Sequence, residues 1–200
     1  LLERLRAYFN KEVSNSEVAA HYASLMMTGN RIVGPEARKK LLREHIFDSS
    51  FIVRYPFKVF DIRWAYLANI RPLFSEPSPD LLKHAMLASN HFFITRDTAD
   101  KAKEGPPFYF APIVCDYDCI SGHARHFPIL LKADTNGAPG ENGFFDNEQP
   151  HVNLSKAARA YLAKLGIKDP DKDMKTASLI WLHALAIGYS PAYLTDSTDG

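Results

Sequence analysis

The stretch from Phe60 to Tyr66 restricts the possible folds of this chain more than any other segment. Large apolar side chains alternate there with charged or small ones, in the order Phe60, Asp61, Ile62, Arg63, Trp64, Ala65 and Tyr66. A period of two is typical of a β-strand with one face against a hydrophobic core and the other in water. We therefore predict a strand over residues 59–67, with its aromatic side chains half-buried.

Four more segments in the middle of the chain have the composition of strands. They are Phe51–Tyr55, His91–Thr95, Phe108–Cys115 and His126–Lys132, with a helix predicted over Pro79–Leu87. Residues 133–150 are rich in Gly, Asn, Asp and Pro, which predicts a long loop.

Both ends of the chain are predicted to be helical. Ser16-Glu17-Val18 and Gly34-Pro35-Glu36 have the pattern of helix starts, the second with proline in its first turn. Two C-terminal helices are predicted, over Leu154–Leu165 and Met174–Tyr189. The fold class is α+β: a central mixed or antiparallel sheet over about residues 51–132, with a helical linker or bracing segment at 1–47 and helices at the C-terminal side.

The composition is sufficient for one compact hydrophobic core, and the chain as a whole is not strongly basic. Of the 200 residues 46% are hydrophobic, and 24 Lys and Arg face 23 Asp and Glu, for a net charge of +1. A free-standing DNA-binding domain is usually strongly basic, so any basic surface must be local. There is no signal peptide and no apolar run of about 18 residues. We expect a cytoplasmic protein without membrane association, and a piece of a longer chain.

Arginines recur among aromatic residues through the middle zone. The segments that carry them are Tyr55–Tyr66, Arg71-Pro72-Leu73, Asn90–Arg96 and Ser121–Ile129. Guanidinium groups read guanine edges or hold phosphates, and aromatic rings stack on bases. The order of these elements resembles the DNA target-recognition region of adenine-specific DNA methyltransferases. It is most similar to the C-terminal specificity domain of type ISP restriction–modification enzymes, over about residues 50–200.

The resemblance implies a partner and a division of labour. Residues 51–200 would be a target-recognition domain that binds duplex DNA and selects a sequence through groove contacts. A separate methyltransferase domain of the same parent chain would flip the target adenine and methylate it with S-adenosylmethionine. The parent would be a site-specific adenine DNA methyltransferase, with or without restriction activity. No cofactor is expected in the present piece.

Eight side chains are the predicted DNA contacts. Six of them are predicted to contact base edges or phosphates: Arg63, Arg71, Arg96, Ser121, His123 and Arg125. The other two, Arg54 and Lys58, are predicted to hold phosphates. Arg96 directly follows its predicted strand, and a rigid strand end suits a groove-reading side chain. A DNA role requires these groups to converge on one surface at the rim of the sheet. Structural alternatives stay open: Arg63 can pair with Asp61 inside the fold, and the others can be solvated at turns.

The same region contains Cys115, Cys119, His123 and His126, which have the identities but not the spacing of a zinc site. Four residues of extended strand span about 13 Å, too far for two sulfurs to share one ion. We therefore expect buried cysteines and no metal. In the apolar C-terminal helix, Trp181 and His183 are expected in the core.

Catalytic motifs are missing from the chain. There is no Asp/Asn-Pro-Pro-aromatic motif for a flipped base, no glycine-rich turn for a methyl donor, and no nuclease, Walker or Gly-x-Ser-x-Gly motif. We expect no catalysis by this chain alone. Two alternatives remain: a protein-interaction or scaffold domain of a large bacterial enzyme, which the near-neutral charge favours, and a metalloenzyme built on the Cys/His segment.

Overall fold

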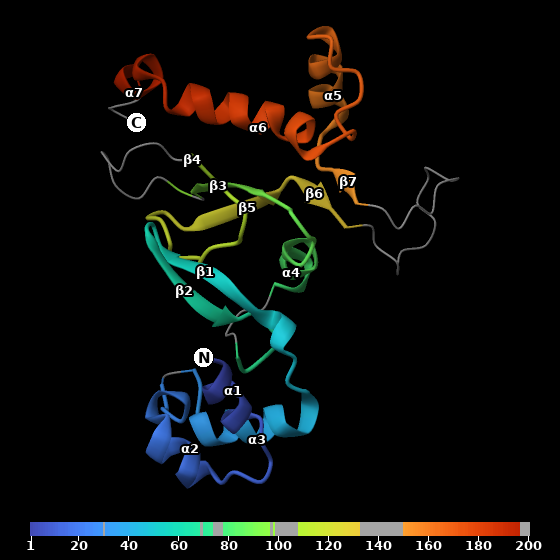
Figure 1. Cartoon of the computed structure of the whole chain (residues 1–200). Coiled ribbons are helices and arrows are strands. Elements are labelled where there is room, and N and C mark those ends of the chain that lie inside the picture. Colours follow the sequence, from blue (N-terminus) through green and yellow to red (C-terminus); the bar gives the residue numbers. More distant parts are fainter. Residues whose placement is uncertain are drawn as a thin grey trace. The chain divides into compact units, whose positions relative to one another are not determined.

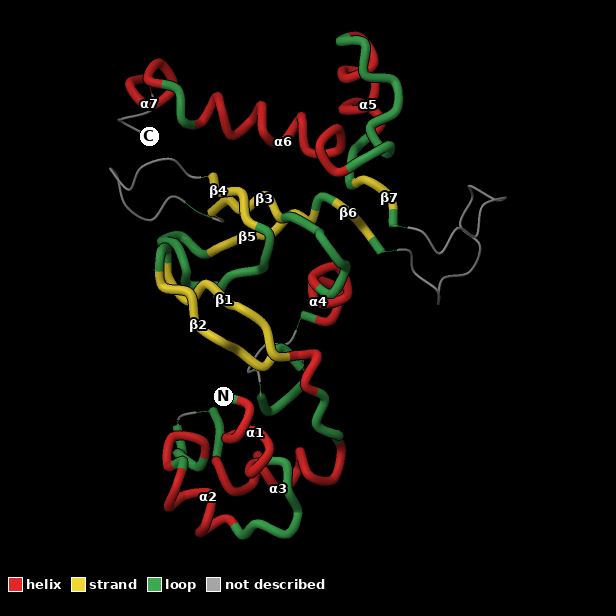
Figure 2. Tube along the Cα trace, viewed as in Figure 1, coloured by secondary structure: helices red, strands yellow, loops and turns green. Residues whose placement is uncertain are grey.

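The computed structural model describes residues 1–29, 31–68, 70–73, 78–96, 98, 108–132 and 150–196. Helices and small antiparallel sheets are both present, which confirms the α+β class (Figures 1 and 2). The chain divides into two compact units. The first consists of Leu1–Arg54 and Arg63–Leu82, and the second of Tyr55–Ile62 and Lys83–Gly200. The hairpin of β1 (Ile52–Lys58) and β2 (Asp61–Tyr66) contributes residues to both units.

In the first unit, the helices Asn15–His21 and Gly34–Glu44 begin at or next to the predicted helix starts at Ser16 and Gly34. Its helices are α1 (Leu2–Tyr8), α2 (Asn15–His21) and α3 (Gly34–Glu44). The Ser14 hydroxyl accepts a hydrogen bond from the Glu17 amide, and the Glu17 carboxylate accepts one from the Ser14 amide. This reciprocal capping satisfies two amides that the first turn of α2 leaves without helical partners.

A buried arginine joins the helices of the first unit. Arg38 on α3 is only 3% exposed. Its guanidinium donates to the carbonyl oxygens of Tyr8, Asn10 and Val13 and to Oδ1 of Asn15, over 2.6–2.8 Å. These acceptors supply the hydrogen bonds that a guanidinium loses when it leaves water, so Arg38 has a structural role.

The second unit contains a three-stranded antiparallel sheet. Its central strand β3 (Phe92–Arg96) lies between β4 (Phe108–Ala111) and β5 (Ala124–Pro128). Helix α6 (Met174–Gly188) covers one face of this sheet, as Figure 1 shows. Phe93 and Ala177 belong to the core cluster between them, and Trp181 packs against it. The C-terminal helix thus braces the sheet, and Trp181 lies at the core as expected.

The remaining elements are short. They are α4 (Pro79–Ala85), α5 (Lys156–Lys164), α7 (Pro191–Asp196) and a small antiparallel pair of β6 (Leu130–Leu131) with β7 (His151–Val152). The sequence did not predict β7 or α7, and the predicted loop at 133–150 lies almost wholly outside the described residues. Instead of one central sheet, the described strands form three small sheets. None of the helices in the described ranges combines the length and the apolar character needed to cross a bilayer.

Two burial predictions were wrong. Trp64 and Ile62 are 57% and 47% exposed on β2, and Phe60 lies in the turn before that strand with its side chain fully exposed. Of the aromatic residues in the alternating stretch, Tyr66 alone is buried. His183 on α6 is also exposed. Alternation reports which side chains share a face, but whether another element covers that face is decided by tertiary packing.

Candidate nucleic-acid interface

The end of the three-stranded sheet carries two of the predicted arginines. In the β3–β5 register, Thr95 lies opposite Arg125 and Arg96 lies opposite Ala124. Opposed residues share a face of the sheet, and consecutive residues alternate between faces. Arg96 and Arg125 therefore leave opposite faces of the sheet, and Arg125 shares the face of Phe93, which α6 covers. The expectation that all predicted contacts converge on one surface is wrong for this pair.

The turn before β5 is rigidly placed. Gly122 and His123 have φ of +77° and +64°. The Thr98 amide donates to the Gly122 carbonyl oxygen at 3.1 Å. A Cβ on Gly122 would lie 1.9 Å from the Thr98 carbonyl oxygen and 3.4 Å from Cβ of Arg96. Only glycine allows this approach, so the turn holds Ser121, His123 and Arg96 near one another rather than acting as a flexible hinge.

Lys58 and His123 meet at Asp118. The Nδ1 atom of His123 lies 3.0 Å from Oδ1 of Asp118, and its ring stacks on Tyr117 with the centroids 4.3 Å apart and the planes 9° apart. The Lys58 ammonium donates to the Asp118 backbone carbonyl. We call Lys58, Tyr117, Asp118 and His123 the Asp118 cluster. All four side chains are exposed, and they present an ammonium, an aromatic ring, a carboxylate and an imidazole to solvent.

The hairpin end is attached to the same segment. The Asp116 amide donates to the Pro56 carbonyl oxygen at 2.9 Å, and the Tyr55 hydroxyl donates to Oδ2 of Asp116 at 3.2 Å. Burial and the neighbouring Asp116 carboxylate raise the pKa of Tyr55 above its ordinary range, so the hydroxyl keeps its proton. These contacts hold residues 55–58 beside the Asp118 cluster within the second unit.

Cys115 and His126 form a neutral pair. The Nε2 atom of His126 accepts a hydrogen bond from the Cys115 amide at 3.1 Å and lies 3.2 Å from its Sγ. Burial lowers the pKa of His126 to about 4 and raises the pKa of the Cys115 thiol. A nucleophilic cysteine needs the opposite shifts, toward thiolate and imidazolium. Among the described residues, no group of three or more His, Cys, Asp or Glu side chains could hold a metal ion.

The first unit carries the other three predicted arginines. The Arg54 guanidinium lies 5.3 Å from the centroid of the Trp64 ring, a cation–π contact along the hairpin. Arg63 is exposed on β2, which disfavours an interior ion pair. Arg71 is exposed in a turn and precedes Pro72 through a cis peptide bond.

The family model of the type ISP C-terminal specificity domain matches residues 2–195. The chain belongs to this family. The match extends through the N-terminal helices, beyond the 50–200 segment that carried the resemblance. Membership implies target recognition in restriction–modification enzymes. No curated protein and no solved structure matches the chain.

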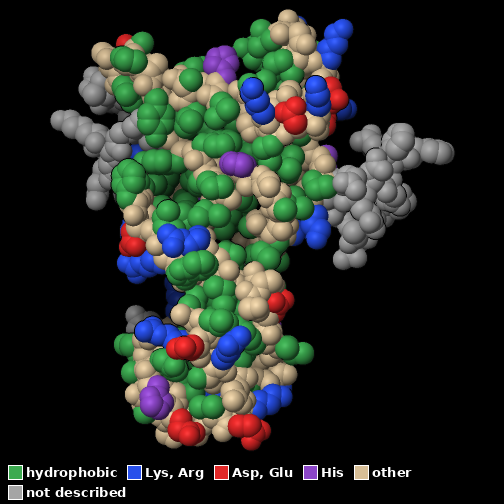
Figure 3. Space-filling view, viewed as in Figure 1, with side chains coloured by type: hydrophobic (Ala, Val, Ile, Leu, Met, Phe, Trp, Pro, Cys, Tyr) green, Lys and Arg blue, Asp and Glu red, His purple; other side chains and the backbone are tan. Residues whose placement is uncertain are grey.

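This specificity domain presents its charges in mixed groups. Figure 3 shows that, on the face drawn, basic side chains around α5 are interspersed with acidic ones. The Arg159 guanidinium, for example, donates to both carboxylate oxygens of Asp171, at 2.5 and 3.1 Å. Such paired cations contribute little to the attraction of an anionic partner. Cations next to a neutral acceptor, as Lys58 is, contribute more.

Sequence reasoning missed four residues that shape the site. Asp116, Tyr117 and Asp118 position the hairpin and His123, and the only signal was their place directly after an apolar strand. Asn90 is 2% exposed, and its side chain bonds both the amide and the carbonyl of Leu130. It joins the start of β3 to β6. The Asn90–Arg96 motif therefore includes a residue that holds the sheet together.

Proposed function

We propose that this chain binds duplex DNA and selects the sequence at which a restriction–modification enzyme acts, without catalysis of its own. The observation that carries the proposal is the match to the type ISP specificity domain over residues 2–195. The side-chain chemistry supports it, because the Asp118 cluster and the β3 end offer cationic and hydrogen-bonding groups on fixed backbone.

The predicted contacts take different roles in this proposal. Lys58 would hold a phosphate, since its ammonium binds a neutral carbonyl and keeps its charge available. His123, fixed by Asp118 and Tyr117, would present its other ring nitrogen, Nε2, to the DNA. Arg125 is exposed at a strand start and would read a base edge or hold a phosphate on its own face of the sheet.

Methylation would be carried out by another domain of the parent protein. The present chain has no glycine-rich turn for S-adenosylmethionine and no base-flipping motif, and its Cys115–His126 pair is neutral. We propose that the parent is a cytoplasmic adenine-specific DNA methyltransferase whose catalytic domain binds S-adenosylmethionine. This chain would then supply the choice of site.

Selection from a random pool of duplex DNA tests the proposal. The protein is mixed at low salt with 40-base-pair duplexes that share fixed ends and a random centre, and bound DNA is sequenced over several rounds. A common sequence should emerge, and affinity for it should fall as salt rises. A scaffold domain would retain no DNA at low salt, and a non-selective binder would retain DNA without enrichment; either result would refute the proposal.

A further inference from the structure

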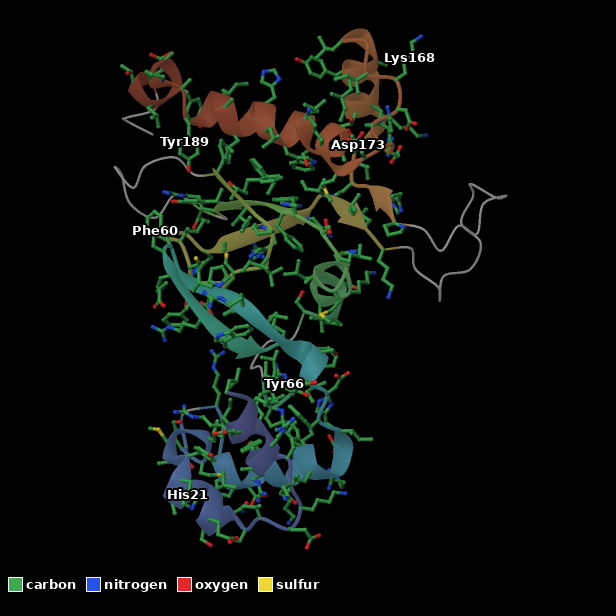
Figure 4. The ribbon with its side chains drawn as sticks, in the orientation of Figure 1. His21, Phe60, Tyr66, Lys168, Asp173 and Tyr189 are labelled. Atoms are coloured by element: carbon green, nitrogen blue, oxygen red, sulfur yellow. The ribbon has the colours of Figure 1, made fainter. Side chains whose placement is uncertain are left out.

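The tip of the β1–β2 hairpin presents a fully exposed phenylalanine. β1 ends at Lys58 and β2 begins at Asp61, so Val59 and Phe60 form a two-residue turn. The Phe60 side chain is 100% exposed and that of Val59 is 38% exposed. Figure 4 shows Phe60 at the tip, with its ring directed away from the strands. Exposure of this extent means that the ring contributes nothing to the core.

The backbone at Phe60 is also unfavourable for this residue type. Its φ is +68°, in the left-handed region. Any residue with a Cβ is disfavoured there by about 1 kcal/mol or more, and turns with positive φ usually contain glycine or asparagine. Phe60 therefore costs stability through its backbone and recovers none through packing. Strain of this kind at an exposed position points to a role outside the fold.

The tip is held in a fixed position within the second unit. The Pro56 carbonyl accepts from the Asp116 amide, and Lys58 donates to the Asp118 carbonyl. These bonds anchor the strand that leads into the turn two and four residues before Phe60. A ring on an anchored hairpin end loses little conformational entropy on binding, so more of its contact energy contributes to affinity.

The surroundings of the ring identify the kind of partner. Lys58 lies two residues before Phe60 in the sequence, and its ammonium is 5.7 Å from the centroid of the Phe57 ring. In the part of the chain that the structure describes, this ammonium donates to the Asp118 backbone carbonyl rather than to a carboxylate. Val59 and Ile62 beside the ring are 38% and 47% exposed, but Phe60 is fully exposed and projects from a narrow two-residue turn. A ring that projects in this way is far too small to form a protein interface by itself, because such an interface buries about 800 Å² on each side. It has the size of one base step, and a cation beside it matches the phosphates that flank such a step.

We propose that Phe60 enters the DNA as a wedge and partly unstacks one base step, while Lys58 holds a neighbouring phosphate. This inference rests on the proposed DNA-binding function and adds a mode of recognition to it. Wedge insertion kinks and untwists the duplex, and its cost depends on the step that is opened. Pyrimidine–purine steps open most easily, so the wedge would favour them without a hydrogen bond to any base.

Plasmid unwinding tests the wedge. Nicked circular plasmid DNA is incubated with the whole chain at low salt and sealed with ligase, and the linking number is measured after the protein is removed. Binding of the same plasmid is measured in parallel. The wild-type protein should shift the linking number in proportion to the bound protein. Phe60→Ala should bind at least about five-fold more weakly, as expected for a lost stacking contact, and should produce no shift at matched occupancy.

Two further variants control for folding and for general loss of an aromatic ring. Phe60→Gly should also lose the shift while its thermal stability rises, because glycine relieves the positive φ. Tyr161→Ala removes an exposed aromatic ring from α5 and should behave as wild type. If wild type and Phe60→Ala shift the linking number equally, or if wild type binds without any shift, the wedge is refuted and DNA binding stands. Absence of wild-type binding would refute both.

Discussion

The Thr98 amide donates a hydrogen bond to the Gly122 carbonyl oxygen, and the Thr98 carbonyl oxygen occupies the place where a Cβ of residue 122 would lie. This contact ties the turn before β5 to the segment that follows β3. It explains why the sequence has glycine between Ser121 and His123, two residues that we predict to contact DNA.

Gly122→Ala should destabilise the second unit by about 2–4 kcal/mol, because the new methyl group clashes with backbone and the positive φ is unfavourable. Gly166→Ala is the matched control: its φ is +86°, but nothing lies within 4 Å of the added Cβ. It should cost only about 1 kcal/mol. Urea denaturation compares the two, and equal costs would show that the turn is not tightly packed against Thr98.

Asn90→Leu should destabilise the protein by about 3 kcal/mol or more. The substitution keeps the side-chain size but removes the partners of the buried amide and carbonyl of Leu130. Asn153→Leu removes one side-chain bond, to the Pro128 carbonyl, and should cost about 1 kcal/mol. Chemical denaturation measures both. Similar losses in the two variants would contradict the central structural role of Asn90.

Arg38→Met should destabilise the first unit by about 3 kcal/mol or more, since three backbone carbonyls lose their donors. Lys39→Met, at an exposed neighbour on α3, should change stability by less than about 0.5 kcal/mol. Thermal unfolding followed by circular dichroism distinguishes them. A mild effect of Arg38→Met would mean that water reaches these carbonyls.

Stability should fall between pH 7 and pH 5 because of His126. Its pKa is lowered from 6.5 to about 4 in the folded protein. As the pH falls below 6.5 the unfolded imidazole takes up a proton that the folded one refuses, so unfolding is favoured. The free energy of unfolding should be lower by about 2 kcal/mol at pH 5, because each pH unit below 6.5 costs about 1.4 kcal/mol. Urea denaturation at both pH values measures the loss.

His126→Gln removes this titrating group and should flatten the pH dependence by that amount, whatever its effect on stability at pH 7. His21→Gln, at an exposed histidine on α2, should leave the pH dependence as in wild type. If the His126 variant loses stability with pH as steeply as wild type does, the imidazole is not held neutral in the fold.

Arg125→Ala should weaken binding to the selected DNA sequence by about 1–3 kcal/mol if Arg125 reads a base. An equal loss on all sequences, with a smaller salt dependence, would identify a phosphate contact instead. Fluorescence anisotropy with the selected duplex and a scrambled duplex distinguishes the two.

Arg96→Ala should be compared with Arg96→Lys, because the half-buried stem of Arg96 also packs beside Gly122. An unchanged affinity in both Arg125→Ala and Arg96→Ala would remove these arginines from the interface.

The types and order of most local elements followed from the sequence alone, although β7 and α7 did not. The predicted starts at Ser16-Glu17 and at Gly34-Pro35 lie in the first turns of α2 and α3, because the signals that start a helix come from residues within one turn. The cap of α2 itself, Ser14, was not predicted. The alternating stretch likewise forms a strand, since the period of two reflects local backbone geometry. The resemblance to the family could also be seen in the sequence, because it depended on the order of such local elements.

Tertiary structure alone decided which faces are covered and which side chains meet. Arg96 and Arg125 leave opposite faces because β3 and β5 pair in one register, and a shift of that register by one residue would place both on the same face. The exposure of Phe60 and Trp64 depends on whether another element lies over the hairpin, and the meeting of Lys58 with Asp118 joins residues sixty positions apart. Pairing and packing are interactions between distant segments, and the local pattern of a sequence does not contain them.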